Sequence, residues 1–581
     1  MSGGEKRLIQ MSVDTKRMDY YFPLLIALLA ILSYIRLFFL NNVFWDDHCW
    51  LQSIYTSNDI FDFLNTGFIE LRRVSQGIVL YLILILFKIT NHAFVVLHLI
   101  TISAQILTPV FLYLLINKLF QNRIAAFIIG SSLIIYPIDT TVPVLTILPY
   151  RLGLMFSVIS FYLTYGALAE KIRWFYMIIA LLLSGMSHYF LVEGTIALEP
   201  ARLFMIGFVL NNKGYKRNEI IKNSLKYWLP FILLCIPVVI YKLLYKPYGI
   251  YVGTYSSDML FILKWKRHLY YLAMLFGGNW VYLLVKAESL SFWPVISGLI
   301  ALFTTYFMLT KKYPDDPGFK EIGHVLTCPE TKSATTRINM IILLGLLLLL
   351  PIAIMYEYAS RELGPGFNSR HGCIMQFGNA LIIGGMVCVI VNKVLNNSKY
   401  KKQYIALSMA ALLGLGVFFN NLNLDLYFKI WEQEKQFYGA FLKRFPTLPK
   451  KSDFMFDIQM SIPLGYRYVT YNAEFPINML YAESTKPGEF RSHKVTDWYY
   501  FDHSKIDEPR YETLNHWGKD IFYTKELIVI RWQPGELLVN REIIKKYPSV
   551  DYKYMADKDV PLAPSVSIYP LREKMNAFLG K

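Results

Sequence analysis

The stretch Tyr21–Trp50, YFPLLIALLAILSYIRLFFLNNVFWDDHCW, indicates how this chain is built. Its first part, residues 21–40, is almost entirely apolar and has the length needed to cross a hydrocarbon core roughly 30 Å thick. A basic leader, residues 1–20, precedes it, and no small-residue cleavage site follows it before the next polar stretch. We therefore interpret residues 21–40 as an uncleaved signal anchor and residues 1–20 as a cytoplasmic leader.

Apolar runs of similar length recur along the 581 residues, of which 55% are hydrophobic and 17% charged. This composition is typical of a polytopic membrane protein, and it predicts a mainly α fold with a transmembrane helical bundle of about eleven spans within residues 21–421. The predicted spans are 21–40, 94–117, 123–138, 145–168, 174–190, 194–211, 228–245, 292–310, 339–356, 373–392 and 404–421.

The basic residues predict the orientation. The net charge is +17, but most Lys and Arg residues between spans lie in short loops, where they set topology, so nucleic-acid binding is disfavoured. With a cytoplasmic N-terminus, the inner loops hold Lys118 and Arg123; Lys171 and Arg173; Lys213, Lys216, Arg217, Lys222 and Lys226; Lys311, Lys312, Lys320, Lys332 and Arg337; and Lys393, Lys399, Lys401 and Lys402. The outer loops are poorer in basic residues, as this orientation requires.

Two apolar stretches are left out of the count. Residues 77–89 are too short to span comfortably, and residues 259–286 mix basic and aromatic residues as interfacial helices do. We expect both to lie along the outer membrane surface. The first outer loop is then 41–93, and residues 422–581 lie outside the cytoplasm.

The tail 422–581 is rich in Tyr, Trp, Asp, Glu and Lys, with turn signals such as Pro487-Gly488. The stretches Lys525–Trp532 and Tyr466–Tyr471 have the pattern of strands. The tail is therefore predicted to be a small α+β soluble domain. It contains none of the five cysteines, which are scattered, form no metal-type pair and are expected to be core residues.

Adjacent carboxylates follow the first span directly. Asp46 and Asp47 lie between Trp45 and Trp50, beside His48. An interfacial aromatic belt explains the tryptophans but not a pair of carboxylates at the bilayer surface. This pair is the strongest local signal of function in the sequence.

Further charged residues fall on the same predicted outer side. Arg151 lies about two turns inside its span, where an unpaired guanidinium is expensive and often functional. Each of the others has an equally good interpretation as an interfacial ion pair or a snorkelling side chain, so their shared side is the better argument. They are Arg72, Arg73, Asp139, His188, Glu193, Glu199, Arg361, Glu362, Arg370 and His371.

Carboxylates and arginines at one membrane face suit glycosyl transfer from a lipid-phosphate sugar. A carboxylate acts as general base on the acceptor hydroxyl, and arginines hold the phosphate as it leaves. The sequence has no glycine-rich phosphate loop on a strand–helix unit, which agrees with a donor other than a soluble nucleotide sugar.

The order of these features resembles the GT-C superfamily of integral membrane glycosyltransferases, whose members carry an acidic motif in the first outer loop. The similarity continues through GIVLYLILILFKITNHAFVVLHLITISAQILTPVFLYLLINKLFQNRIAAF, from Gly77 on. PVLTILPYRLGLMFSVISFYLTY, with Arg151, HYFLVEGTIALEPARLF, with Glu193, and NSRHGCIMQFGNALIIGG, with Arg370, are similar to later segments of members.

The resemblance implies an enzyme that transfers a sugar from a polyprenyl-phosphate donor, with inversion, to a glycan, lipid or protein acceptor outside the cytoplasm. Asp46 or Asp47 is the expected base. Arg151 and Arg370 are the expected phosphate-binding residues, with Arg72, Arg73 and Arg361 as further candidates. His48, Asp139, His188 and Glu193 are second-tier site residues. Some members use a divalent metal, so Mg²⁺ or Mn²⁺ is compatible with the carboxylates, although many carboxylates act without one.

Two other classes of function fit part of the sequence. Intramembrane charges also suit a lipid-linked glycan flippase or transporter, but no paired halves with corresponding broken helices are evident. A non-catalytic scaffold for envelope assembly would leave Arg151 without a purpose. In each case the chain is expected in a bacterial inner membrane or a plasma membrane, in contact with lipid.

Overall fold

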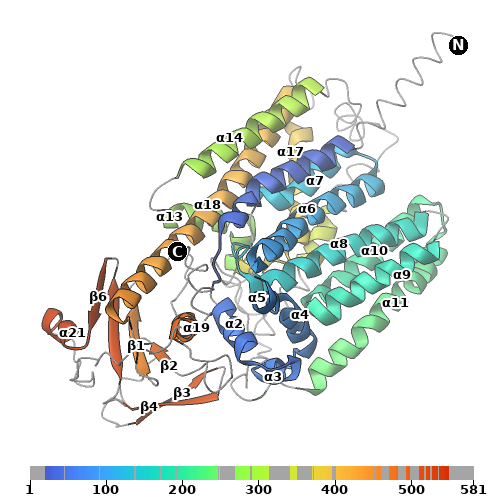
Figure 1. Cartoon of the computed structure of the whole chain (residues 1–581). Coiled ribbons are helices and arrows are strands. Elements are labelled where there is room, and N and C mark those ends of the chain that lie inside the picture. Colours follow the sequence, from blue (N-terminus) through green and yellow to red (C-terminus); the bar gives the residue numbers. More distant parts are fainter. Residues whose placement is uncertain are drawn as a thin grey trace.

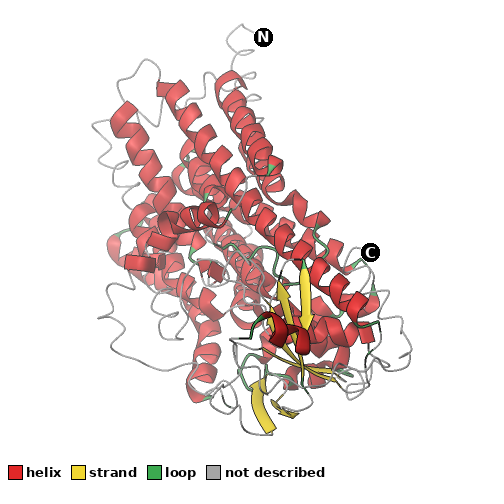
Figure 2. Cartoon of the chain, turned by 90° about the vertical axis from the view of Figure 1, so that its left-hand side faces the viewer, coloured by secondary structure: helices red, strands yellow, loops and turns green. Residues whose placement is uncertain are grey.

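The computed structural model describes residues 20–44, 46–90, 92–136, 139–169, 173–191, 193–245, 248, 269–271, 273–287, 291–312, 341–349, 369–370, 372–395, 401–446, 448, 452–458, 470–481, 493–497, 510–515, 518–523, 527–533 and 535–548. These residues are mainly helical, with a small mixed sheet near the C-terminus (Figures 1 and 2). This agrees with the predicted mainly α fold followed by a small mixed C-terminal region.

The helical part begins with the apolar helix Tyr20–Phe39, whose last turn is the 3-10 helix η1 (Ile35–Phe39). The helices that follow are α2 (Asp46–Thr56), α3 (Ile60–Asn65), α4 (Val74–Leu84), α5 (Leu86–Ile89), α6 (Ala93–Phe120), α7 (Arg123–Ile135), η2 (Leu145–Ile147), α8 (Leu148–Ala169), α9 (Arg173–Gly185), η3 (Met186–Leu191), η4 (Glu193–Leu198), α10 (Glu199–Asn212), α11 (Arg217–Leu244), η7 (Met274–Gly278), α13 (Asn279–Lys286), α14 (Phe292–Phe307), η8 (Met308–Lys312), α17 (Gln376–Leu395) and α18 (Lys401–Arg444).

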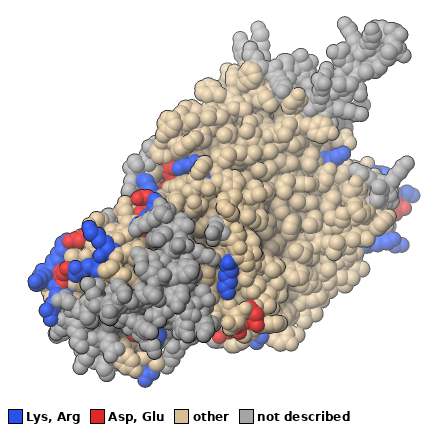
Figure 3. Space-filling view, in the orientation of Figure 1, with Lys and Arg blue, Asp and Glu red and all other residues tan. Residues whose placement is uncertain are grey.

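Seven of the described helices are long and apolar enough to cross a membrane, which indicates an integral membrane protein. They overlap seven predicted spans and are Tyr20–Phe39, Ala93–Phe120, Leu145–Ala169, Trp174–Leu191, Arg217–Tyr241, Phe292–Thr310 and Gln403–Arg444. The predicted span 228–245 starts too late, because α11 begins at Arg217 and includes Lys222 and Lys226, which were predicted to lie in an inner loop. Two further predicted spans, 123–138 and 373–392, correspond to shorter apolar helices, Arg123–Ile135 and Gln376–Ile390. The broad central surface over the helices shows few charged side chains (Figure 3).

The predicted span 194–211 is not one continuous α-helix. A 3-10 helix, η4, occupies its start, and α10 begins only at Glu199, with Pro200 in its first turn. Proline favours the first turn of a helix and cannot donate a hydrogen bond in its interior, so it marks this start. The predicted span 339–356 is described only over its helical residues 341–349; the rest lies outside the described residues.

The apolar stretch 77–89, predicted not to span, forms parts of the two short helices α4 and α5. The stretch 259–286 is described from residue 269 on and contains η7 and α13. Neither stretch forms a membrane-length helix within its described residues.

Helix α18 is the longest described helix and joins the helical bundle to the sheet (Figure 1). Its 44 residues run well past Asn421, where the last span was predicted to end, so the predicted boundary at residue 422 falls inside a continuous helix. Buried asparagines along it donate to main-chain carbonyls of other segments: Asn420 to Ile134, Asn421 to Leu32 and Asn423 to Thr140.

Close helix crossings are made by glycines of α14, α17 and α18. A Cβ on Gly416 would lie 2.6 Å from Ile135 Cα and 2.7 Å from Ile134 O, both main-chain atoms of α7. Gly298 and Gly414 face each other in the same way between α14 and α18. Small residues allow helix backbones this close, which membrane helices use for packing.

The C-terminal strands are β1 (Ser452–Ile458), β2 (His493–Asp497), β3 (Arg510–Asn515), β4 (Gly518–Tyr523), β5 (Ile528–Gln533) and β6 (Glu536–Val539), with helices α19 (Thr470–Tyr481) and α21 (Arg541–Lys546). The larger sheet has the order β2-β1-β5-β6, with β1 parallel to both neighbours and β5 antiparallel to β6. Strands β3 and β4 form a separate antiparallel pair.

The predicted strand Lys525–Trp532 is confirmed as β5, although it begins at Ile528. The predicted strand Tyr466–Tyr471 is wrong at its end, since residues 470 and 471 begin α19; its other residues lie outside the described part of the chain.

The sheet packs directly on the C-terminal half of α18. The Phe437 ring lies 5.7 Å from both Phe456 and Trp532, and the Phe441 ring lies 5.8 Å from Phe454. Phe437 and Phe441 are fully buried, so an apolar stripe one turn apart on α18 forms the core shared with the sheet.

Candidate functional site

Asp47 is a fully buried carboxylate in the first turn of α2. Its Oδ2 accepts from the N–H groups of Phe44, at 3.1 Å, and Leu145, at 3.0 Å, and its Oδ1 accepts from the N–H of Thr146, at 2.8 Å. Asp47 thus links the start of α2 to η2, nearly a hundred residues later. Burial raises the pKa of its carboxyl to about 6, although the three N–H groups act in the opposite direction.

Asp46 lies beside it at the first position of α2 and is only partly buried. The two predicted carboxylates therefore have different environments. Asp47 accepts hydrogen bonds from main-chain N–H groups, whereas Asp46 is the more exposed of the two carboxylates.

Asp47 anchors a buried segment, residues 139–147, which we call the central loop. Within it, Asp139 is 2% exposed and accepts from Arg151 of α8. Arg151 Nη2 lies 2.9 Å and Nε 3.1 Å from Asp139 Oδ2, and Nη1 donates to Val144 O at 3.3 Å. Two residues predicted separately, Asp139 and Arg151, are therefore one buried ion pair.

Other elements hold the central loop from its opposite sides. Asn423 of α18 donates to Thr140 O at 2.9 Å, and Ser369 Oγ accepts from Thr140 N at 2.8 Å. Arg370, next to Ser369, is partly exposed. Non-helical backbone inside a membrane bundle must have its polar groups satisfied by protein, and these contacts do that. The loop therefore contacts Asp47, Arg151 and Ser369, and Asp46 and Arg370 adjoin it as sequence neighbours of Asp47 and Ser369.

A pocket beside the central loop reaches Arg151. Its polar lining includes Gln105 and Thr108 of α6, Arg151 of α8 and Gln376 of α17, and apolar side chains such as Leu154 complete it. Four of the five N–H groups of the Arg151 guanidinium have acceptors in Asp139, Thr141 and Val144. Within the described part of the chain, the second N–H on Nη1 has no protein acceptor.

The opposite face of α2 contacts the C-terminal part of the chain. Gln52 Nε2 donates to Glu474 Oε1 of α19 at 3.0 Å. Asn42, just before α2, donates to Glu434 Oε2 of α18 at 2.5 Å, and His48 Nε2 lies 3.8 Å from Glu434 Oε1. His48 therefore points towards α18 and α19.

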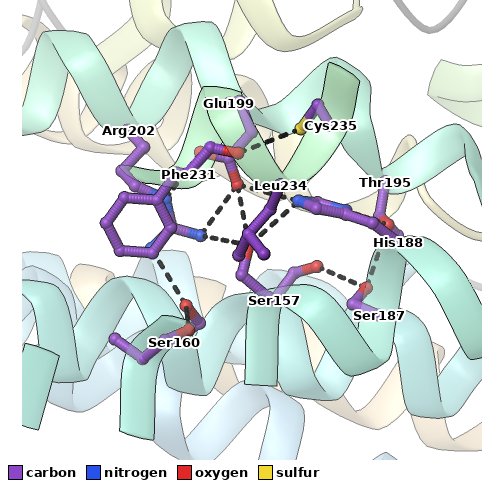
Figure 4. Close-up of polar contacts among 12 residues, drawn as sticks. Ser157, Ser160, Ser187, His188, Thr195, Glu199, Arg202, Phe231, Leu234 and Cys235 are labelled. Carbon is purple, nitrogen blue, oxygen red and sulfur yellow. Dashed lines mark hydrogen bonds and ion pairs between the residues drawn. The ribbon is translucent and has the colours of Figure 1, made fainter. Parts of the chain in front are cut away.

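A second buried cluster lies between α8, η3, η4, α10 and α11 (Figure 4). Arg202 donates from Nε to Glu199 Oε2 at 2.8 Å and from Nη2 to Glu199 Oε1 at 3.0 Å. His188 Nε2 lies 3.1 Å from Glu199 Oε1, and its Nδ1 lies 2.8 Å from Thr195 Oγ1. His188 thus belongs to this cluster.

Arg202 is fully enclosed by its partners. Its Nη1 donates to Ser160 Oγ at 3.0 Å and Thr164 Oγ1 at 2.8 Å, and its guanidinium carbon lies 4.3 Å and 4.0 Å from the ring centres of Phe161 and Phe231. Every polar atom of the Glu199–Arg202 pair is occupied by protein, so the cluster is a structural network.

The remaining predicted residues are dispersed. Arg72, in a left-handed backbone conformation at φ 57°, lies over Tyr248 at 4.8 Å and Tyr245 at 5.6 Å, and Arg73 precedes α4. Glu193 begins η4, but its side chain lies outside the described part, as do Arg361 and His371.

Sequence reasoning missed Arg202, Glu434 and Glu474. Arg202 could have been found, because Glu199 and Arg202 are three residues apart within a predicted span, and a charged pair at that spacing inside a membrane is unusual. Glu434 and Glu474 carried no signal, since they lay in a tail predicted to be soluble. The prediction that the cysteines are core residues is confirmed for Cys49, Cys235, Cys373 and Cys388, which are all buried.

Among the described residues, no group of three His, Cys, Asp or Glu side chains is arranged to hold a metal ion. Comparison with models of protein families, with curated proteins and with solved structures finds no match to this chain. The seven membrane-length helices and the small mixed sheet therefore define its class by themselves, that of an integral membrane protein with a C-terminal sheet region.

Proposed function

We propose that this protein is a GT-C-like membrane glycosyltransferase that moves a sugar from a polyprenyl-phosphate donor to an extracytoplasmic glycan, lipid or protein acceptor. The proposal includes the eleven-span topology, with the N-terminus in the cytoplasm and the sheet region outside it. The observation that carries it is that two adjacent aspartates have different environments, Asp47 buried and hydrogen-bonded to main chain and Asp46 partly exposed. Asp47 is fixed to the central loop by two main-chain hydrogen bonds, from Leu145 and Thr146, and a third comes from Phe44, just before α2. This holds the partly exposed Asp46 on the same framework as Arg151.

In the proposed reaction, Asp46 takes the proton of the acceptor hydroxyl as that oxygen attacks the anomeric carbon. The bond from the anomeric carbon to the phosphate oxygen breaks, and polyprenyl phosphate leaves with the electron pair. Attack from the side opposite to the phosphate inverts the anomeric centre. The remaining N–H of Arg151, together with Arg370, is suited to hold the phosphate as its charge develops.

Transfer of radiolabelled sugar from several polyprenyl-phosphate sugars to a crude envelope acceptor tests this proposal on the purified protein in lipid. The variants are Asp46→Asn and Asp47→Asn, with Asp62→Asn, an exposed residue of α3, as a matched control. We expect Asp46→Asn to lower kcat by about 10²–10⁴-fold, as loss of a general base does, and Asp62→Asn to leave kcat unchanged. Transfer at the wild-type rate by Asp46→Asn would refute the assignment of the base.

A second candidate function is a lipid-linked glycan flippase. The interrupted helices η3 and η4 favour this candidate, because transporters place broken helices within the bilayer. Binding of a donor without transfer to any acceptor, together with no effect of either aspartate substitution, would shift the assignment to the flippase.

A further inference from the structure

Helix α2 is held from two directions. At its N-terminal end, Asp47 ties it to the central loop. About one turn and a half further on, Gln52 binds Glu474 of α19. Asp46 and Gln52 are six residues apart, which places them roughly 120° apart around the helix. The contact with α19 can therefore set the rotation of α2 without occupying the side on which Asp46 lies.

The contact between α2 and the C-terminal part of the chain is fully enclosed. Gln52 is 0% and Glu474 is 1% exposed, and the neighbouring Asn42 and Glu434 are both 0% exposed. The Phe475 ring, next to Glu474, lies 6.3 Å from the His48 ring. Buried carboxylates and amides are costly to leave without a partner, so separating α19 from α2 would strand the buried Glu474 carboxylate and the Gln52 amide donor.

The structure assigns Glu474, through Gln52, the role of a positioning residue for Asp46, with Glu434 and Asn42 as a second contact of the same kind. The C-terminal region thus contributes to the candidate active site, because its helix α19 fixes α2, the helix that carries the base. This inference rests on the proposed function.

The substitution Gln52→Glu tests the contact because it places a second carboxylate against Glu474. Two buried carboxylates within hydrogen-bond distance repel each other when both are ionised, and they keep a hydrogen bond only when they share one proton. We expect kcat, relative to the wild type at the same pH, to fall by about 100-fold at the alkaline end of the profile, where the pair loses its shared proton; this is the size of effect that a misplacement of 1 Å produces. The ratio should approach the wild-type value as the pH is lowered and the pair shares one proton again. Other titratable groups at this contact are His48 and Glu434, and Lys88 donates to Ser57 O at the far end of α2.

The exchanged pair Gln52→Glu/Glu474→Gln provides the rescue. It restores one carboxylate and one amide, so kcat and its wild-type pH profile should return. Gln403→Glu, which adds the same charge at an exposed position of α18, is the control and should leave kcat and KM unchanged. A wild-type kcat in Gln52→Glu, or a folded double variant that remains as slow as the single one, would overturn the inference.

Hydrogen–deuterium exchange of residues 46–56 in the full chain separates this inference from the proposed function. We expect faster exchange in Gln52→Glu than in the wild type, and wild-type exchange in the double variant. If the wild type transfers no sugar but exchange follows this order, the proposed reaction fails and the coupling between α19 and α2 stands. Unchanged exchange in Gln52→Glu would overturn the coupling itself.

Discussion

Removal of Arg202 should destabilise the helical bundle strongly, because the buried carboxylate of Glu199 loses its positively charged partner. In Arg202→Met, the methionine keeps an apolar side chain between Phe161 and Phe231, so packing changes little. The change removes both hydrogen bonds to Glu199, at 2.8 and 3.0 Å, and leaves that fully buried carboxylate with His188 and Ser184. Breaking one partner of a buried pair costs about 3–5 kcal/mol, which is the expected loss of unfolding free energy.

The double variant Glu199→Gln/Arg202→Met separates the cost of an unpaired charge from the worth of the pair. It removes both charges, and the amide oxygen of the introduced glutamine can still accept from the Ser184 hydroxyl. We therefore expect the double variant to be more stable than Arg202→Met alone. The coupling free energy of the cycle should be about 3 kcal/mol, at the upper end for residues in contact.

Equilibrium unfolding of the purified protein in mixed micelles, followed by helical circular dichroism, measures these differences. Arg444→Met is the matched control. Its pair with Glu542 is 3.1 Å long, but the two side chains are 49% and 45% exposed, so we expect a loss below about 1 kcal/mol. Losses in Arg202→Met no larger than in this control, or additive effects in the cycle, would refute the reasoning.

The packing and the charges lead to three further predictions. Burial raises the pKa of Asp47 to about 6, so between about pH 4 and 6 the native state keeps a proton that the unfolded state has released. The contribution of this carboxyl to the free energy of unfolding should therefore decrease by about 3 kcal/mol as the pH rises through that range and stay constant above it. The difference in unfolding free energy between wild type and Asp47→Asn, followed against pH, measures this. Gly416→Ala should cost about 1–3 kcal/mol because its Cβ meets main-chain atoms of α7, whereas Gly207→Ala, whose nearest contact would be an ordinary 3.5 Å, should not destabilise; equal melting temperatures would contradict the close crossing. Phe441→Ala should cost about 3–5 kcal/mol and make the C-terminal sheet region sensitive to limited proteolysis, and an unchanged digestion pattern would show that the sheet does not depend on α18.

The long apolar helices could be predicted from the sequence because membrane spanning depends on local composition and length. The predicted spans 21–40 and 292–310 match membrane-length helices almost residue for residue. The span boundaries were predicted wrongly where contacts between distant segments decide the structure. Helix α18 continues past Asn421 because its buried polar and aromatic residues contact other segments of the chain.

The candidate site could be predicted only in part. The sequence singles out Asp139 and Arg151 one by one, but their pairing depends on a turn whose path no local pattern specifies. His188 shares the predicted outer side with them and yet lies in a different cluster, since its position in a π-helix turns it towards Glu199. Two residues on the same side of the membrane lie at a similar depth, but their lateral distance depends on which helices pack together.

The sequence by itself therefore determined the class of this protein: a membrane-embedded helical bundle followed by a mixed C-terminal region, with an acidic pair after the first span. Only the tertiary structure distinguished Asp46 from Asp47, because that difference comes from main-chain N–H groups almost a hundred residues away. Hydropathy is a sum over neighbouring residues and survives in the sequence, whereas the environment of a carboxylate depends on whatever the fold brings beside it.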